Sequence, residues 1–231
     1  MNDNRLFQSG FTGNQLKMIA MISMTLDHIG LLLLPQWTIL RILGRLAMPI
    51  YAYMIAEGCR HTRNRKKYFL RIACLAAVCQ GVYLIALGSL YMSILVTFSL
   101  SILLICAIEN FQIKRSRGSQ ILAFGSLLMV FFLCVALPEL WKGTDFGIDY
   151  GLAGVLLPVL VYFGSEKTKY LTAGLILLGF SYGSIQWFAL AAVPLLGMYN
   201  GRRGKGNWGI WFYLYYPLHL LVLHGISLVI R

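Results

Sequence analysis

The apolar stretch from Leu16 to Leu34, LKMIAMISMTLDHIGLLLL, is long enough to cross a membrane, yet it carries Asp27 and His28 in its interior. A bilayer core needs about 20 mostly apolar residues in a helix. An ionisable side chain at the centre of such a helix costs on the order of 2.5–3.5 kcal/mol. Two adjacent ionisable residues therefore indicate either a polar site or an ion pair that locks helices together.

The next apolar segment follows Pro35 and adds Arg41 and Arg45, four residues apart on one helical face. A short turn joins the two segments, so we expect an antiparallel helix pair in which the ionisable groups meet. A structural lock needs only two of the four groups, which favours a functional site. Adjacent helical residues point about 100° apart, so one of Asp27 and His28 can face the second helix while the other faces a cavity.

Composition fixes the fold class. The 231 residues are 58% hydrophobic and 12% charged, which predicts an all-α, polytopic transmembrane helix bundle. We expect a polar cytoplasmic tail over residues 1–15, no removable signal peptide, and a single transmembrane domain over residues 16–231. About nine spans are expected, near residues 16–34, 38–58, 68–88, 91–109, 120–138, 148–163, 169–183, 185–199 and 208–230.

Proline and glycine residues lead us to expect irregular helices in three of these spans. Pro49 is expected to kink the second span, because proline removes a helical hydrogen bond. The spans near 169–183 and 185–199 are short and contain Gly or Pro, so we expect partial or tilted helices there.

The net charge of +12 reflects membrane topology rather than nucleic acid binding, because 16 of the 20 Lys and Arg fall in alternate connections between the spans. This asymmetry follows the positive-inside rule and predicts a cytoplasmic N-terminus. The five cysteines show no C-x-x-C spacing, so neither a metal site nor a disulfide framework is expected.

Two cationic loops are candidate anion sites. The loop RHTRNRKK contains Arg60, His61 and Arg63, which either set topology and attract anionic lipid or bind the phosphates of a cofactor such as a coenzyme A thioester. The loop NGRRGKGN has the composition of an anion clamp, although a positive-inside loop explains its charges equally well.

His28 is the candidate proton acceptor, and His219 is a second histidine expected to be functional. Imidazole titrates near neutrality, and Asp27 or another carboxylate would orient the His28 ring. The alternative is a packed histidine bonded to a neighbouring carbonyl. His219 lies two residues after Pro217 in the last apolar span, where only a cavity would supply water.

Five segments taken together resemble the TraX family. They are TLDHIG, LRILGRLAMPIYAYMIAEGCRHTRN, DYGLAGVLL, QWFALAAVPLLGMYNGRRG and FYLYYPLHLLVL, and the resemblance runs from about Leu16 to Leu223. TraX proteins are polytopic bacterial inner-membrane proteins, and the named member acetylates the N-terminal amino group of conjugative F-type pilin. The family also looks like a distant relative of the acyltransferase-3 membrane enzymes.

The resemblance implies an acetyl-CoA-dependent acyltransferase in the bacterial inner membrane. Its acceptor would be an amine or hydroxyl of a protein, glycan or lipid, with a pilin-like peptide among the candidates. His28 would deprotonate the acceptor, and Arg45 or Arg41 would stabilise the oxyanion or neutralise Asp27. The candidate catalytic residues are His28, Asp27, Arg45 and His219. The candidate cofactor-binding residues are Arg41, Arg60, His61, Arg63, Asn200, Arg202 and Arg203.

Two other classes of function fit the same residues. A proton-coupled transporter would use the buried Asp and His and the short spans near 169–183 and 185–199. A non-enzymatic scaffold in a membrane assembly would use the buried charges only to pin helices.

Overall fold

A computed structural model of the chain describes residues 10–206 and 209–230, and within these ranges the regular structure is helical. The predicted all-α class is therefore confirmed. Four stretches in the described ranges are long and apolar enough to cross a membrane: Thr38–His61, Arg65–Ile85, Ile94–Lys114 and Arg117–Leu140. The first helix has spanning length, with 20 residues, but is not one of these four. The nine spans and the cytoplasmic N-terminus stay predictions, and residues 1–9 of the expected tail lie outside the described ranges.

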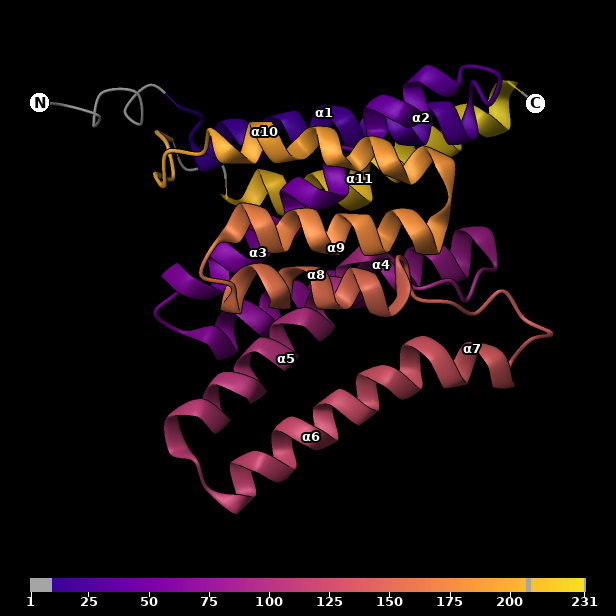
Figure 1. The fold of residues 1–231 in the computed structure, drawn as a ribbon. Coiled ribbons are helices and arrows are strands. Elements are labelled where there is room, and N and C mark those ends of the chain that lie inside the picture. The colour runs from indigo at the N-terminus through magenta and orange to yellow at the C-terminus, as the bar shows by residue number, and fades with distance from the viewer. Residues whose placement is uncertain (1–9, 207–208, 231) are drawn as a thin grey trace, which may run out of the picture. The chain divides into compact units, whose positions relative to one another are not determined.

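The helices form two compact units, one within residues 10–54, 171–206 and 209–230 and the other within residues 55–170. The first unit contains α1 (Gly13–Leu32), α2 (Thr38–Gly44), the start of α3 (Ala47–His61), most of α9 (Lys167–Tyr182), η3 (Ser184–Ala191), α10 (Ala192–Gly197) and α11 (Gly209–Ile230). Within it, α1 packs against α2 and α11, and α2 contacts η3, a 3₁₀-helical segment (Figure 1). The candidate residues of the first two spans and of the last span therefore share one unit.

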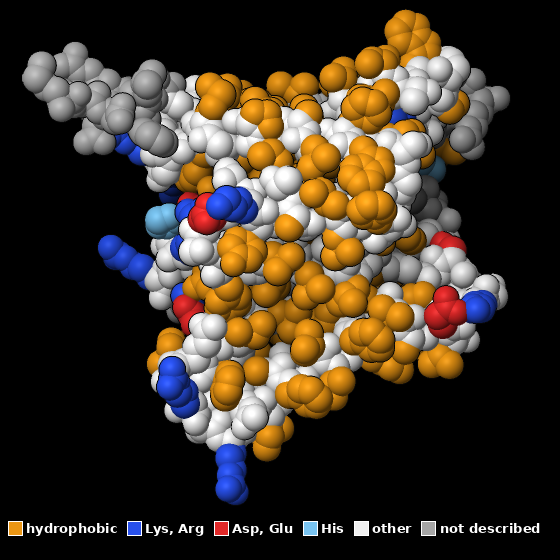
Figure 2. Space-filling view, viewed as in Figure 1, with side chains coloured by type: hydrophobic (Ala, Val, Ile, Leu, Met, Phe, Trp, Pro, Cys, Tyr) orange, Lys and Arg blue, Asp and Glu red, His pale blue; other side chains and the backbone are white. Residues whose placement is uncertain are grey.

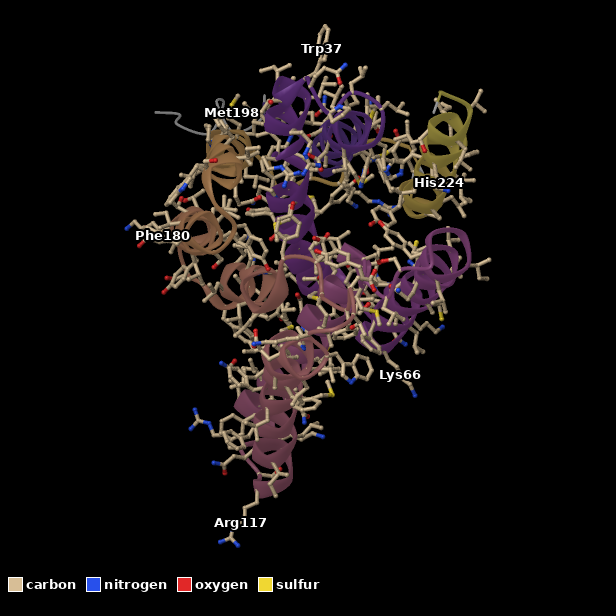
Figure 3. All side chains as sticks on the ribbon, turned by 90° about the vertical axis from the view of Figure 1, so that its right-hand side faces the viewer. Trp37, Lys66, Arg117, Phe180, Met198 and His224 are labelled. Carbon is tan, nitrogen blue, oxygen red and sulfur yellow. The ribbon has the colours of Figure 1, made fainter. Side chains whose placement is uncertain are left out.

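The second unit is arranged around α5 (Ile94–Lys114), which contacts α4 (Arg65–Leu87), α6 (Arg117–Phe131) and α8 (Gly151–Phe163). The α6 helix continues through a π-helical segment, η2 (Phe132–Ala136), into α7 (Leu137–Leu140). Apolar side chains lie exposed along α6, and Lys and Arg side chains gather at its N-terminal end, where Arg117 is labelled (Figures 2 and 3). An apolar face of this length is typical of a surface in contact with lipid.

The second predicted span is divided into two helices. A turn at Arg45 and Leu46 separates α2 from α3, and Pro49 lies in the first turn of α3. The expected break is therefore present, but it lies before the proline rather than at it. The first four N–H groups of a helix have no partner within the helix, so a proline in the first turn is tolerated.

Two glycines bring α1 and α2 unusually close. A Cβ atom on Gly44, at the end of α2, would overlap the side chain of Asp27 on α1. A Cβ atom on Gly30 would lie 3.0 Å from the Cβ of Leu40 and 3.3 Å from the side chain of Arg41. The turn between the two helices carries Trp37, whose side chain projects outward and is 56% exposed (Figure 3). Glycine at these positions lets the guanidinium groups of α2 reach a carboxylate on α1.

We predict that Gly44→Ala lowers the thermal stability of the purified protein, because the added methyl group must displace the Asp27 side chain. Overpacking of this kind costs about 1–3 kcal/mol. The matched control is Gly125→Ala in α6, where an added Cβ meets nothing within 4 Å. The control should be neutral or stabilising by up to about 1 kcal/mol, since alanine favours the helix. Equal unfolding temperatures for the two variants in detergent would contradict the close approach.

Candidate functional site

A carboxylate between two guanidinium groups lies at the contact of α1 with α2. Arg41 Nη1 donates to Asp27 Oδ2 at 2.9 Å, and Arg45 Nη2 donates to Asp27 Oδ1. The side chains of Asp27, Arg41 and Arg45 are 15%, 26% and 11% exposed. Of the four ionisable groups expected to meet here, these three do, whereas His28 contacts α11 instead. The cluster carries one more positive charge than negative.

Arg45 has further partners beyond the carboxylate. Its Nε donates to the backbone oxygen of Arg41 at 3.3 Å, and its Nη1 donates to Gln186 Oε1 at 3.3 Å. Gln186 lies in η3 and is 3% exposed. No role could be predicted for Gln186, because nothing in the residues near it in the sequence marks it as a partner of the second span.

A pair of histidines lies at the contact of α1 with α11. His219 Nε2 is 3.1 Å from His28 Nδ1, and the ring centroids are 5.0 Å apart. Two residues proposed separately as catalytic candidates therefore form one pair, although 191 positions separate them in the sequence. His219 is 7% exposed, and Tyr215 stacks on its ring with the centroids 5.1 Å apart.

Backbone carbonyls fix the protonation pattern of this pair. His219 Nδ1 lies 2.9 Å from the oxygen of Tyr215, and His28 Nδ1 lies 3.0 Å from the oxygen of Met24. Because a carbonyl oxygen can only accept, each Nδ1 must carry a proton when the rings are neutral. His219 Nε2 then accepts from His28 Nδ1–H, and the lone pair of His28 stays on Nε2, the nitrogen needed to take a proton from a substrate.

The expectation that a carboxylate orients His28 is wrong for the described residues. Asp27 is bound to the two arginines, and the oriented nitrogen of His28 contacts a carbonyl and an imidazole instead. The angular separation of neighbouring helical residues gives the reason, since it directs Asp27 to α2 and His28 to α11. His28 is therefore bonded to a neighbouring backbone carbonyl, as the alternative interpretation expected, and it also contacts His219.

Tyr215 also joins α11 to α1 through its hydroxyl group. The Thr25 hydroxyl donates to the oxygen of Met21 at 2.8 Å, so the bond between Thr25 Oγ1 and the Tyr215 hydroxyl has the tyrosine as its donor. Together with the ring stacking on His219, this bond positions the histidine pair from one side.

The glycine-rich loop after α10 is bound to the start of α1. The N–H groups of Gly13 and Asn14 donate to the backbone oxygens of Arg202 and Arg203 at 2.8 and 2.9 Å. The Asn200 amide donates to the oxygen of Gly10 at 2.8 Å and accepts from the N–H of Arg202. Asn200 therefore stabilises the contact of this loop with the segment before α1, while the side chains of Arg202 and Arg203 are exposed.

The basic loop after α3 belongs to the second unit, where Glu57, a residue not predicted to belong to a site, binds part of it. Arg60 Nη1 donates to Glu57 Oε1 at 2.7 Å, and its Nη2 donates to the backbone oxygen of Val161 at 2.6 Å. His61 Nε2 lies 3.4 Å from Oε2 of the buried Glu57 carboxylate. Lys167 Nζ donates to Glu57 Oε1 at 2.8 Å. The Arg60 side chain is therefore bound within the protein, whereas the side chains of His61 and Arg63 are exposed.

A second, partly exposed charge pair lies within the same unit. Arg65 forms an ion pair with Glu109 of α5, and the Tyr162 hydroxyl donates to Glu109 at 2.8 Å. The signal that could have identified both Glu57 and Glu109 is the same one that identified Asp27, a carboxylate within an apolar segment.

The chain is similar to known proteins over most of its length. The family model described as "TraX protein" matches residues 12–227. The chain is 29% identical over 245 residues to a probable fimbrial assembly protein, FimC of serogroup H1, from Dichelobacter nodosus, which covers 92% of this chain and 94% of that protein. A stretch of 38 residues is 58% identical to an uncharacterized protein of Rickettsia prowazekii strain Madrid E, covering 16% of this chain and 15% of that protein. No solved structure matches the chain.

We predict that Asp27→Asn destabilises the protein, because it leaves two largely buried guanidinium groups without their counter-charge. Removal of one partner from a buried charge pair costs about 3–5 kcal/mol. The measurement is the thermal unfolding of the purified protein in detergent.

A second substitution tests the cause of this loss. In the double variant Asp27→Asn with Arg41→Met, one of the two excess cations is gone, so part of the lost stability should return. Glu139→Gln, which breaks the exposed ion pair between Glu139 and Lys142, serves as the control and should change stability little. Purely additive effects of the Asp27 and Arg41 substitutions would contradict the electrostatic account.

Proposed function

Since the chain belongs to the TraX family, we propose that it is a membrane acyltransferase that moves an acetyl group from acetyl-CoA to an amine or hydroxyl acceptor. The observation that carries the proposal is the histidine pair, whose geometry leaves a basic lone pair on His28 Nε2. The family match and the apolar helices support a membrane protein. We further propose that it is a multi-pass protein of the bacterial inner membrane.

In the proposed reaction, His28 is the general base. His28 Nε2 takes the proton of the acceptor as its nitrogen or oxygen attacks the thioester carbonyl. The new bond to the acetyl carbon forms, the bond from carbon to sulfur breaks, and the proton ends on the coenzyme A thiolate. General base catalysis of this kind contributes about 10²–10⁴-fold.

His219 supports His28 by accepting a hydrogen bond from it. When His28 Nε2 gains a proton, the ring becomes positively charged, and its Nδ1–H points at His219 Nε2 at 3.1 Å. The second imidazole can share that proton, which spreads the charge over two rings. His219 is therefore a positioning and proton-sharing residue in this mechanism.

In the same proposal, Asp27, Arg41 and Arg45 act through their charges. The carboxylate already accepts from two guanidinium groups, which makes it a poor general base. The excess positive charge of the cluster favours the negative charge that develops on the carbonyl oxygen during transfer.

The donor and the acceptor are proposed on chemical grounds. The exposed side chains of Arg202, Arg203, His61 and Arg63 are the candidates for contact with the phosphates of coenzyme A, since the Arg41 and Arg60 guanidinium groups are bound to carboxylates. The Dichelobacter nodosus relative is described as a probable fimbrial assembly protein. We therefore propose the N-terminal amine of a pilin-like peptide as the first acceptor to test, ahead of glycans and lipids.

A proton-coupled transporter is the second candidate. The observation that favours it is the same histidine pair, because two hydrogen-bonded imidazoles can pass a proton between them. It differs from the acyltransferase in one measurable way, since it would move a substrate along a pH gradient without consuming acetyl-CoA.

We predict that the purified protein in lipid nanodiscs transfers labelled acetyl from acetyl-CoA to a pilin-like peptide, and that His28→Gln lowers the rate by about 10²–10⁴-fold. The matched control is His224→Gln, which changes a histidine of α11 that lies outside the pair (Figure 3). His224→Gln should leave the rate unchanged.

Full activity of His28→Gln would remove His28 from the mechanism. Flux driven by a pH gradient in proteoliposomes, with no consumption of acetyl-CoA, would replace the acyltransferase by the transporter. Absence of both activities in a well-folded parent protein would favour the scaffold.

A further inference from the structure

The side-chain amide nitrogen of Gln186 is a buried donor without an acceptor. Gln186 is 3% exposed, and its Nε2 has no hydrogen-bond partner in the described part of the chain. A buried donor left without a partner costs about 1–3 kcal/mol. Such groups are rare in folded proteins, and a catalytic role or a bound water or ion is among the explanations for them.

The orientation of this amide is fixed by its neighbour. A guanidinium group can only donate, so the atom of Gln186 that faces Arg45 Nη1 at 3.3 Å must be the oxygen. The nitrogen and its two hydrogens then point away from Arg45. The orphaned donor is therefore a consequence of the charge cluster, and an exchange of the amide oxygen and nitrogen would not remove it.

Each of the three guanidinium nitrogens of Arg45 already donates a hydrogen bond within the protein. Its Nε, Nη1 and Nη2 donate to the Arg41 backbone oxygen, to Gln186 and to Asp27. Its positive charge nevertheless acts on Gln186, because a hydrogen bond to the amide oxygen polarises the amide and strengthens its N–H groups as donors. The stabilising role expected of Arg45 can thus reach a substrate through Gln186.

We propose that Gln186 Nε2 donates a hydrogen bond to the carbonyl oxygen of the acyl group during transfer, an inference that rests on the proposed function. The bond strengthens as the acceptor attacks and the carbonyl oxygen becomes an oxyanion. It weakens again when the bond from carbon to sulfur breaks and the carbonyl re-forms. Gln186 gains and loses no proton, since His28 carries the proton.

A carbonyl oxygen suits this donor better than a phosphate. The donor is a single neutral amide in a buried site, and a phosphate would bring negative charge that needs several donors or cations that are not already paired. A carbonyl oxygen needs one or two donors and becomes negative only in the transition state, when the polarised amide helps most.

The substitution that tests this inference is Gln186→Glu. It keeps an oxygen for Arg45 and nearly the same shape, but it replaces the donor by an acceptor. We expect kcat for acetyl transfer to fall by about 10²–10³-fold, the loss measured for a single oxyanion donor, with little change in KM for acetyl-CoA. Gln186→Leu should lose activity as well.

The matched control is Gln80→Leu in α4, a glutamine of the second unit whose amide oxygen is also buried without a partner. This control should transfer acetyl at the parent rate. Thermal unfolding of each variant in detergent separates a loss of catalysis from a loss of folding.

A spectroscopic readout tests the contact directly. Acetonyl-CoA is a ketone analogue that keeps the carbonyl and cannot transfer its acyl group. Bound to the parent protein with a ¹³C-labelled carbonyl, it should show a C=O stretch at lower frequency than when bound to Gln186→Glu. A purely structural role for Gln186 would leave this frequency unchanged.

The two proposals fail in different ways. Normal transfer by Gln186→Glu, or an equal carbonyl frequency in the parent and the variant, overturns the role of Gln186 and leaves the acyltransferase standing. A parent protein that neither binds acetonyl-CoA nor transfers acetyl overturns the proposed function, and the role of Gln186 with it.

Discussion

The bond between one carboxylate and two guanidinium groups is the constraint on which the first unit depends. Three charged groups that are mostly removed from solvent are tolerated only if they satisfy one another, and they can do so here because Gly44 and Gly30 let α1 and α2 approach closely. Once Asp27 is turned to α2, the next residue along α1 must point elsewhere. His28 therefore meets α11, and the charge cluster and the histidine pair follow from one helical geometry.

The features that could be predicted from the sequence are those that depend on residues close together in the chain. The all-α class and the meeting of Asp27 with Arg41 and Arg45 follow from hydropathy and from two segments joined by a short turn. The sequence could not predict that His28 meets His219, because 191 intervening positions carry no spacing information and only the packing of α11 on α1 decides the contact. Gln186 was missed for the same reason.

The roles of the cationic residues could not be predicted from the sequence for a different reason. A sequence gives the number of positive charges in a loop but not the partners of each one. Arg60 is bound to Glu57 and to backbone oxygens, and the amide of Asn200 holds the segment before α1. Composition alone could not separate these two from the exposed Arg63, Arg202 and Arg203.

The attachment of α1 at two points along its length has a mechanical consequence. Its first N–H groups are bound by the loop that leads toward α11, and the turn of the helix that contains Thr25 and His28 is bound by α11 itself. A helix fastened twice to neighbouring parts of the same segment cannot swing away from it about either fastening. Any movement that brings a substrate to the imidazoles must therefore keep α1 and α11 together.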